Sequence, residues 1–94
     1  MSIEPKVLYA RKSAFAARKV GDELVLVPVK GSVADMEEMF TLNDVGAFIY
    51  EQLAADATVE GLEQAIMTEF EADRKEVRAD LEDFLSLLGS FMLK

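Results

Sequence analysis

Runs of apolar residues in the first half of the chain predict strands. Residues 24–29 (LVLVPV) form an almost unbroken aliphatic run, typical of a strand covered on both faces and therefore of the middle of a sheet. Residues 14–20 alternate poorly and predict a weaker first strand, which a turn at Gly21-Asp22 joins to the middle one. Pro28 has no N–H to donate, so we expect it near the end of its strand or at a bulge.

A loop at residues 30–35 leads to a short third strand, predicted at residues 37–42. In a simple meander this third strand lies at an edge of the sheet, with its outer N–H and C=O groups unpaired. Apolar and polar positions alternate along it. Phe40 and Leu42 fall on one face, and Met39 and Thr41 on the other.

Three amphipathic helices are predicted to follow, each opened by a residue that caps helix N-termini. The caps are Asn43, Thr58 and Asp73, and Glu76 completes a pattern like a capping box. The first helix runs to about Ala54, the second to about Phe70 and the third toward the C-terminus. The inner faces comprise Val45, Phe48, Ile49 and Leu53 in the first helix, and Leu62, Ala65, Ile66 and Phe70 in the second. Gly46 costs up to about 1 kcal/mol relative to Ala inside a helix, which indicates close packing there.

The third helix has apolar residues around a wide part of its surface. They are Val77, Leu81, Phe84, Leu85, Leu87 and Leu88. At 100° per residue they span an arc of roughly 160°, which is wider than one core-facing stripe needs. One part of the arc is therefore expected to face the core, and the remaining edge to face something else.

Three strands followed by three helices predict an α+β domain. We expect a three-stranded antiparallel sheet followed by a three-helix bundle, with the shape of a winged helix-turn-helix. The 94 residues suit a single domain. Residues 1–13 contain Pro5 and have no clear period, so we expect an N-terminal arm there and the domain itself at residues 14–94.

The amino-acid composition limits the kinds of catalytic and metal site that the chain can form. The chain has no cysteine and no histidine, which excludes disulfides, the usual zinc and iron–sulfur ligands, and Cys–His or Ser–His–Asp catalysis within the chain. Metal sites made of carboxylates alone stay open. Our expectation is no cofactor, no metal site and no catalytic residue. No apolar run is long enough to span a bilayer and no signal peptide opens the chain, so the expected location is the cytoplasm.

Charge is distributed unevenly along the chain. The net charge is −8, but residues 1–30 carry a small basic excess and residues 31–94 carry the acidic excess. An acidic surface repels phosphate backbones and anionic lipids, so we expect neither a nucleic acid nor a membrane as a partner.

Several motifs, in their order and spacing, resemble the PqqD-like family of peptide-recognition proteins. The resemblance covers roughly residues 11–94 and depends most on LNDVGAFIYEQL at 42–53. The other matching segments are Arg11…Phe15…Arg18, LVLVPV, TVEGLEQAI at 58–66 and VRADLEDFLSLL at 77–88, the last of which includes Asp80. Two features depart from the family: Tyr50 stands where Trp is common, and a longer loop follows Pro28 in place of a short Pro-Glu link. The second departure leaves open whether the pathway makes PQQ or another modified peptide.

The resemblance implies a non-enzymatic function. Members of this family bind the leader of a ribosomally synthesised precursor peptide and present it to a maturase, often a radical S-adenosylmethionine (SAM) enzyme. The leader adds a strand beside the third strand and lies against the third helix. Strand addition also follows from the open edge predicted above, because backbone hydrogen bonds supply affinity and neighbouring apolar pockets supply specificity.

We expect the peptide-binding residues on the third strand and the third helix. The candidates are Glu38, Met39, Phe40, Thr41, Leu42, Arg74, Val77, Arg78, Leu81 and Leu85. Arg74 and Arg78, like Lys75, sit where positive charge opposes the helix dipole, so they are candidate partners for leader carboxylates. Arg78 has an alternative partner in Glu82, four residues on. We expect reversal of the arginine charges to leave folding almost intact.

Three other functions fit parts of the pattern. A DNA-binding winged helix has the same element order, but no positive residue lies between Arg78 and Lys94 and the net charge is unfavourable. An enzyme with a carboxylate base is compatible with the many acidic residues, although the sequence places no pair in a cleft. A regulatory subunit that binds only a protein partner also fits. An open edge strand permits a monomer or a weak, strand-exchanged dimer.

Overall fold

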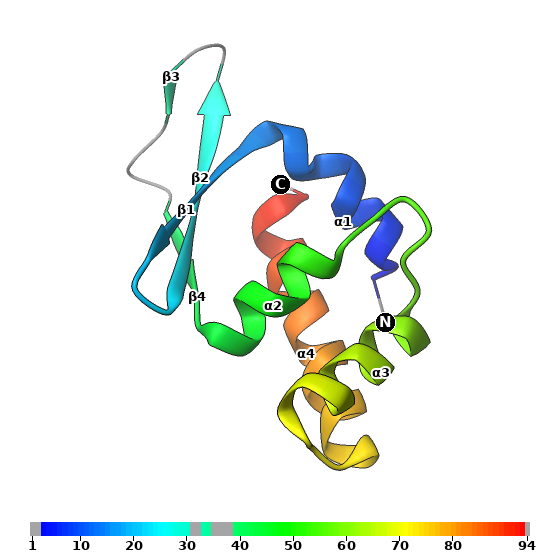
Figure 1. Cartoon of the computed structure of the whole chain (residues 1–94). Coiled ribbons are helices and arrows are strands. Elements are labelled where there is room, and N and C mark those ends of the chain that lie inside the picture. Colours follow the sequence, from blue (N-terminus) through cyan, green and yellow to red (C-terminus); the bar gives the residue numbers. More distant parts are fainter. Residues whose placement is uncertain (1–2, 31–32, 35–38, 94) are drawn as a thin grey trace.

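The computed structural model describes residues 3–30, 33–34 and 39–93 of the chain. A small antiparallel sheet lies on one side and four α-helices on the other (Figure 1). The longest helix, α4 (Arg74–Met92), lies behind α2, and its C-terminal end comes close to the sheet. The predicted α+β class, with antiparallel strands followed by helices, is confirmed.

Strand β2 (Glu23–Lys30) is the middle strand, as its aliphatic run predicts. It pairs antiparallel with β1 (Phe15–Val20) on one side and with β4 (Phe40–Leu42) on the other. The two-residue turn between β1 and β2 contains Gly21 at φ 63°, a conformation that glycine adopts without a steric penalty. The predicted turn and the order of the three main strands are confirmed.

A two-residue strand, β3 (Val33–Ala34), falls where we expected a loop. It pairs with Val29 and Lys30, on the same side of β2 as β4. So short a strand leaves no periodic pattern in the sequence. Pro28 lies on β2 between the part that pairs with β4 and the part that pairs with β3, which fits its lack of an N–H. Residues 37–38 of the predicted third strand lie outside the described residues.

The other helices are α2 (Asp44–Gln52) and α3 (Val59–Phe70). The three predicted caps are present. Asn43 Oδ1 accepts from the Gly46 N–H at 2.8 Å, Thr58 Oγ1 from the Gly61 N–H at 3.0 Å, and Asp73 Oδ2 from the Lys75 N–H at 3.2 Å. Each cap satisfies one of the N–H groups that the first helical turn leaves without a partner.

Part of the expected N-terminal arm is helical. Helix α1 (Pro5–Arg11) continues into a 3₁₀ turn at Lys12–Ala14, and α1 packs against α4. Pro5 stands in the first helical turn, where its fixed φ favours a helix. Leu8 is fully buried and belongs to the same core as the sheet and the other helices. A helix with two buried residues has no repeating pattern that the sequence could show.

Two basic residues of this N-terminal segment bind the C-terminal ends of other helices. Arg11 Nε donates to the Met92 carbonyl of α4 at 3.0 Å, and Lys12 Nζ donates to the Tyr50 carbonyl of α2 at 3.2 Å. Lys12 Nζ also lies 4.5 Å from the centre of the Tyr50 ring. Burial lowers the pKa of Lys12, against the opposing effect of Glu51. Part of the basic excess of residues 1–30 is therefore used inside the fold, where positive charge complements helix dipoles.

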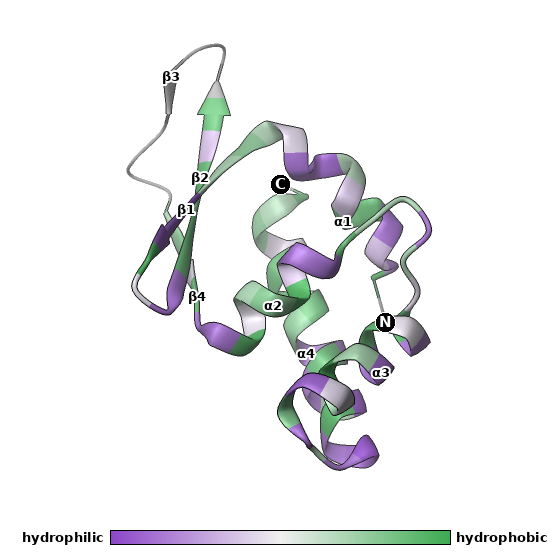
Figure 2. Cartoon of the chain, viewed as in Figure 1, coloured by the Kyte–Doolittle hydropathy of each residue, from purple (hydrophilic) through white to green (hydrophobic). Residues whose placement is uncertain are grey.

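The core lies between the helices and one face of the sheet. The hydrophobic residues of α4 concentrate in its C-terminal half, close to the sheet (Figure 2). The Phe48 and Phe70 rings meet edge to face at 5.5 Å and join α2 to the end of α3. Gly46 packs as closely as its sequence position predicts, because a Cβ added there would lie 2.9 Å from Cε1 of Phe84.

Replacing Gly46 by alanine should therefore destabilise the fold. The higher helix propensity of alanine favours the variant by up to about 1 kcal/mol. Overpacking against Phe84 costs about 1–3 kcal/mol. We expect a net loss of about 1 kcal/mol in the free energy of unfolding, measured by urea denaturation.

Gly61→Ala is the matched control. A Cβ at Gly61 meets only the Thr58 hydroxyl, at 3.2 Å, and the position is exposed. This variant should be neutral or slightly more stable. Equal stability of both alanine variants would contradict the close contact between Gly46 and Phe84.

Candidate functional site

None of the described residues pairs with the outer edge of β4. Within the described part of the chain, β4 pairs with β2 alone, in a register that sets Leu42 opposite Leu24, Thr41 opposite Val25 and Phe40 opposite Leu26. The prediction that the strand before the helices is an edge strand is confirmed. An edge of this kind presents backbone donors and acceptors to another chain.

The register indicates which residue of β4 turns its backbone groups outward. In a hairpin with a two-residue turn, the pair beside the turn exchanges two hydrogen bonds, and bonded and non-bonded pairs then alternate. Val20 and Glu23 flank the turn, so Val25 directs its N–H and C=O toward β1. Thr41, opposite Val25, therefore directs its own N–H and C=O away from β2 and toward the open edge.

One face of α4 lies alongside β4. The Phe91 ring centre is 4.9 Å from that of Phe40, and Phe84 approaches the chain where β4 ends and α2 begins. Leu87 lies three residues after Phe84 and four before Phe91, so it shares their face of the helix. The Leu87 side chain remains 55% exposed. We call the surface formed by Phe40, the outward backbone groups of Thr41, Phe84 and Leu87 the β4–α4 groove; the side chains of Met39 and Thr41 lie on the opposite face of β4.

Four of the apolar residues predicted to bind the peptide are buried and belong to the core instead. Leu42 is 2% exposed, Val77 5%, Leu81 1% and Leu85 0%. Their side chains have no surface to offer beside β4, so the predicted apolar wall does not consist of them. The alternation along the strand is as expected, because Met39 and Thr41 are exposed while Leu42 is buried. Glu38 lies outside the described residues.

Sequence reasoning missed Phe84 and Leu87 as groove residues. Both belong to the wide apolar arc of the last helix, and Leu87 stands at one limit of the arc. The arc predicts that one edge stays outside the core. It does not say which, because Leu85 stands at the opposite limit and is equally apolar. Contacts distant in sequence, such as Phe91 with Phe40, set the rotation of the helix.

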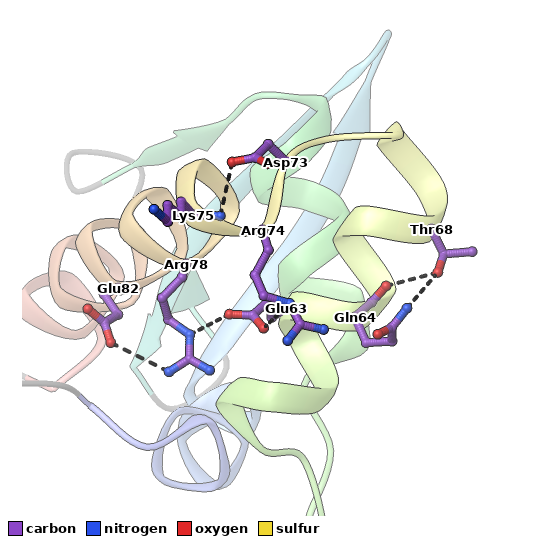
Figure 3. Close-up of polar contacts among 8 residues, drawn as sticks. All are labelled: Glu63, Gln64, Thr68, Asp73, Arg74, Lys75, Arg78 and Glu82. Atoms are coloured by element: carbon purple, nitrogen blue, oxygen red, sulfur yellow. Dashed lines mark hydrogen bonds and ion pairs between the residues drawn. The ribbon is translucent and has the colours of Figure 1, made fainter.

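Arg74 and Arg78 have a partner that sequence spacing did not indicate (Figure 3). Arg78 Nε donates a hydrogen bond to Oε2 of Glu63, and Arg74 Nε lies 3.6 Å from Oε1 of the same carboxylate. Only 7% of the Glu63 side chain is exposed. The expected pair of Arg78 with Glu82 is also present, at 3.9 Å. The hydrogen bond that Arg78 donates to Glu63, together with the neighbouring carboxylates, raises the pKa of Arg78, so it remains charged.

These contacts change what the two arginines are expected to do. A nearly buried carboxylate is costly unless cations and hydrogen bonds compensate it. Arg74 and Arg78 supply that compensation and join α3 to α4. Reversing their charges should therefore disturb folding, contrary to the expectation from the sequence. Their contact with a leader carboxylate stays a prediction.

A cavity of about 360 Å³ lies between the start of α2, the end of α3 and the first half of α4. Its buried lining residues are Gly46, Ile49, Ile66, Val77 and Leu81. Phe84 lines the cavity and also borders the β4–α4 groove. Two of the predicted site residues, Val77 and Leu81, thus line a cavity rather than an open wall.

The described residues contain no group of three or more acidic side chains arranged to hold a metal ion. None of the helices in this part of the chain is long and apolar enough to cross a membrane.

An open edge strand beside an exposed apolar helix face, within a domain of this α+β class, defines a small recognition module. Residues 23–90 match the family model described as Coenzyme PQQ synthesis protein D (PqqD). The chain belongs to the PqqD family, which confirms the resemblance found in its motifs.

A solved structure with a similar fold is described as TbiB1 in complex with the TbiA(beta) leader peptide. It has 30% sequence identity and a TM-score of 0.67, and the match covers 84% of this chain and 86% of that chain. A comparison with curated proteins found no match.

Reversing one arginine charge tests the buried ion pair. In Arg78→Glu a second carboxylate faces Glu63, so we expect a clear fall in the melting temperature measured by circular dichroism. The control, Lys75→Glu, makes the same charge change about one helical turn away. Lys75 is exposed and forms no ion pair with any described residue, so this variant should alter the melting temperature little. Equal effects of the two variants would show that Glu63 does not depend on Arg78.

Proposed function

We propose that this protein binds the leader segment of a ribosomally synthesised precursor peptide and presents it to a modifying enzyme. The leader adds a strand to the outer edge of β4 and places alternate side chains in the β4–α4 groove. The observation that carries this proposal is the open edge at Thr41 beside the exposed Leu87. Backbone pairing and an apolar groove together are what strand-addition sites use.

The relative with a similar fold supports this proposal. TbiB1 was solved in complex with a leader peptide, and the match covers most of both chains at 30% identity. Membership of the PqqD family supports the same function. The family resemblance suggests a radical SAM enzyme or another maturase as the partner that receives the peptide, with this chain acting as a carrier and not as a catalyst.

The opposite edge of the sheet is less suited to a guest strand. Residues 16–20 of β1 are exposed, and Lys19 of this strand forms an ion pair with Glu51 at 3.7 Å. A charged, twisted edge with lysines is a common protection against strand pairing. Leu87 of α4 remains exposed on the side of the helix whose Phe91 contacts Phe40 of β4, which favours that edge.

Binding to DNA is disfavoured by the charges of the described residues. Arg74 and Arg78, two of the three basic residues at the start of α4, are held by Glu63. A DNA-reading helix needs cations free to meet phosphates, and this protein carries a net charge of −8. Recognition of a peptide requires no such surface.

Proline at Thr41 tests strand addition, because it deletes the N–H that points to the open edge. We expect Thr41→Pro to weaken leader binding by about tenfold, the effect of losing one backbone hydrogen bond and leaving its acceptor unpaired. The measurement is calorimetry with a synthetic leader peptide encoded by a short reading frame near the gene.

Two controls accompany this variant. Thr41→Val changes the side chain but keeps the N–H, and should bind as the parent does. Ala17→Pro deletes an N–H that the same alternation directs to the outer edge of β1, so it should leave the affinity unchanged. A loss of affinity in Ala17→Pro but not in Thr41→Pro would move the site to the other edge and overturn the proposal.

Substitutions at Leu87 and at Leu81 distinguish a residue of the groove from a residue of the core. Leu87→Ser should weaken leader binding roughly tenfold while the melting temperature stays near that of the parent, because the side chain is already exposed. Leu81→Ala should cost about 2–5 kcal/mol in the free energy of unfolding, because it truncates a side chain that is buried in the core. If Leu87→Ser binds the leader normally, the groove has been placed on the wrong face of α4.

A further inference from the structure

Asp80 places a carboxylate at an apolar cavity. It is the acidic residue among those that line the 360 Å³ cavity, whose other residues are apolar apart from Asn43. Asp80 is exposed, and no described residue forms a hydrogen bond or an ion pair with its side chain. The Asn43 side-chain oxygen, by contrast, is occupied by the Gly46 N–H.

We propose that this cavity takes a basic side chain of the leader peptide. The aliphatic stem of the side chain packs on the buried lining residues, and its cationic head pairs with Asp80 at the rim. This inference rests on the proposed function and adds to it the chemical class of a leader residue that the protein selects.

The composition of the cavity favours this occupant over a purely apolar side chain. Seating an apolar group would remove water from the Asp80 carboxylate without replacing it, which costs free energy. Lysine and arginine have an apolar stem and a charged end, so each satisfies both parts of the cavity. Arginine can form an additional interaction, because its planar guanidinium stacks on aromatic rings and the cavity is lined by Phe70 and Phe84.

The position of the cavity places it in reach of the same peptide. Asn43, which lines the cavity, follows directly after β4, and Phe84 belongs to both the cavity and the β4–α4 groove. An extended chain advances about 3.3 Å per residue. A leader paired with Thr41 therefore passes the cavity within a few residues of that pair.

The affinity test compares Asp80→Asn with Asp83→Asn. Both substitutions remove one negative charge from the same helix, both positions are exposed, and Asp83 does not line the cavity. The probe is the synthetic leader peptide from the neighbouring reading frame, used also in versions with each basic residue replaced singly by norleucine. We expect roughly fivefold weaker binding for Asp80→Asn, the size of an ion pair at a partly exposed site, and no change for Asp83→Asn.

A double-mutant cycle identifies the partner residue. One norleucine peptide should lose about the same fivefold against the parent protein and lose little more against Asp80→Asn, because the two changes remove one interaction. Methyl NMR gives an independent measurement. The Ile66 and Leu81 methyl signals should shift when the parent leader binds, and shift less with that norleucine peptide.

Each other result counts against the inference. If the leader binds but Asp80→Asn and Asp83→Asn behave alike, or if a bound leader has no basic residue, the cavity does not select a cation and the proposed function still stands. Methyl shifts that depend on protein concentration without peptide would show a second copy as the occupant and overturn the inference. If no leader binds the parent protein, the proposed function fails, and this inference fails with it.

Discussion

The burial of α4 is the interaction on which the rest of the structure depends. One side of this helix supplies Leu81, Leu85 and Leu88 to the core, and Phe91 packs against the Phe40 ring of the sheet. Because these contacts fix the rotation of the helix, Leu87 remains outside the core, on the side of α4 that also carries Phe84 and Phe91. The apolar groove is thus a by-product of how the core is filled, and it needs no separate element to hold it in place.

Local signals in the sequence predicted most of the fold. The aliphatic run of β2, the turn at Gly21 and the three helix caps each report a conformation decided within a few residues. The elements that were missed, α1 and β3, are short and contribute few buried positions, so they produce no periodic pattern. Tertiary contacts, such as the burial of Leu8, stabilise α1 instead.

The candidate site was harder to predict because its residues come together through contacts distant in sequence. The sequence indicates that the arc of α4 is too wide for the core, but Leu85 and Leu87 are equally good candidates for the outer edge. The buried Glu63 gave no signal either, because its arginine partners lie on another helix and spacing within one helix cannot find them. Charge that appears available to a ligand in the sequence is therefore partly committed to the fold.

The short length of β4 has a consequence for how firmly a guest is held. Its pairing with β2 spans three residues, and Pro28 interrupts the ladder beyond them. Few backbone bonds can form along such a short stretch, so main-chain pairing alone gives loose and unselective attachment. Side-chain contacts then have to discriminate between peptides, and a bound peptide dissociates quickly. Fast release suits the proposed transfer of the peptide to a modifying enzyme, because a longer ladder would retain the peptide.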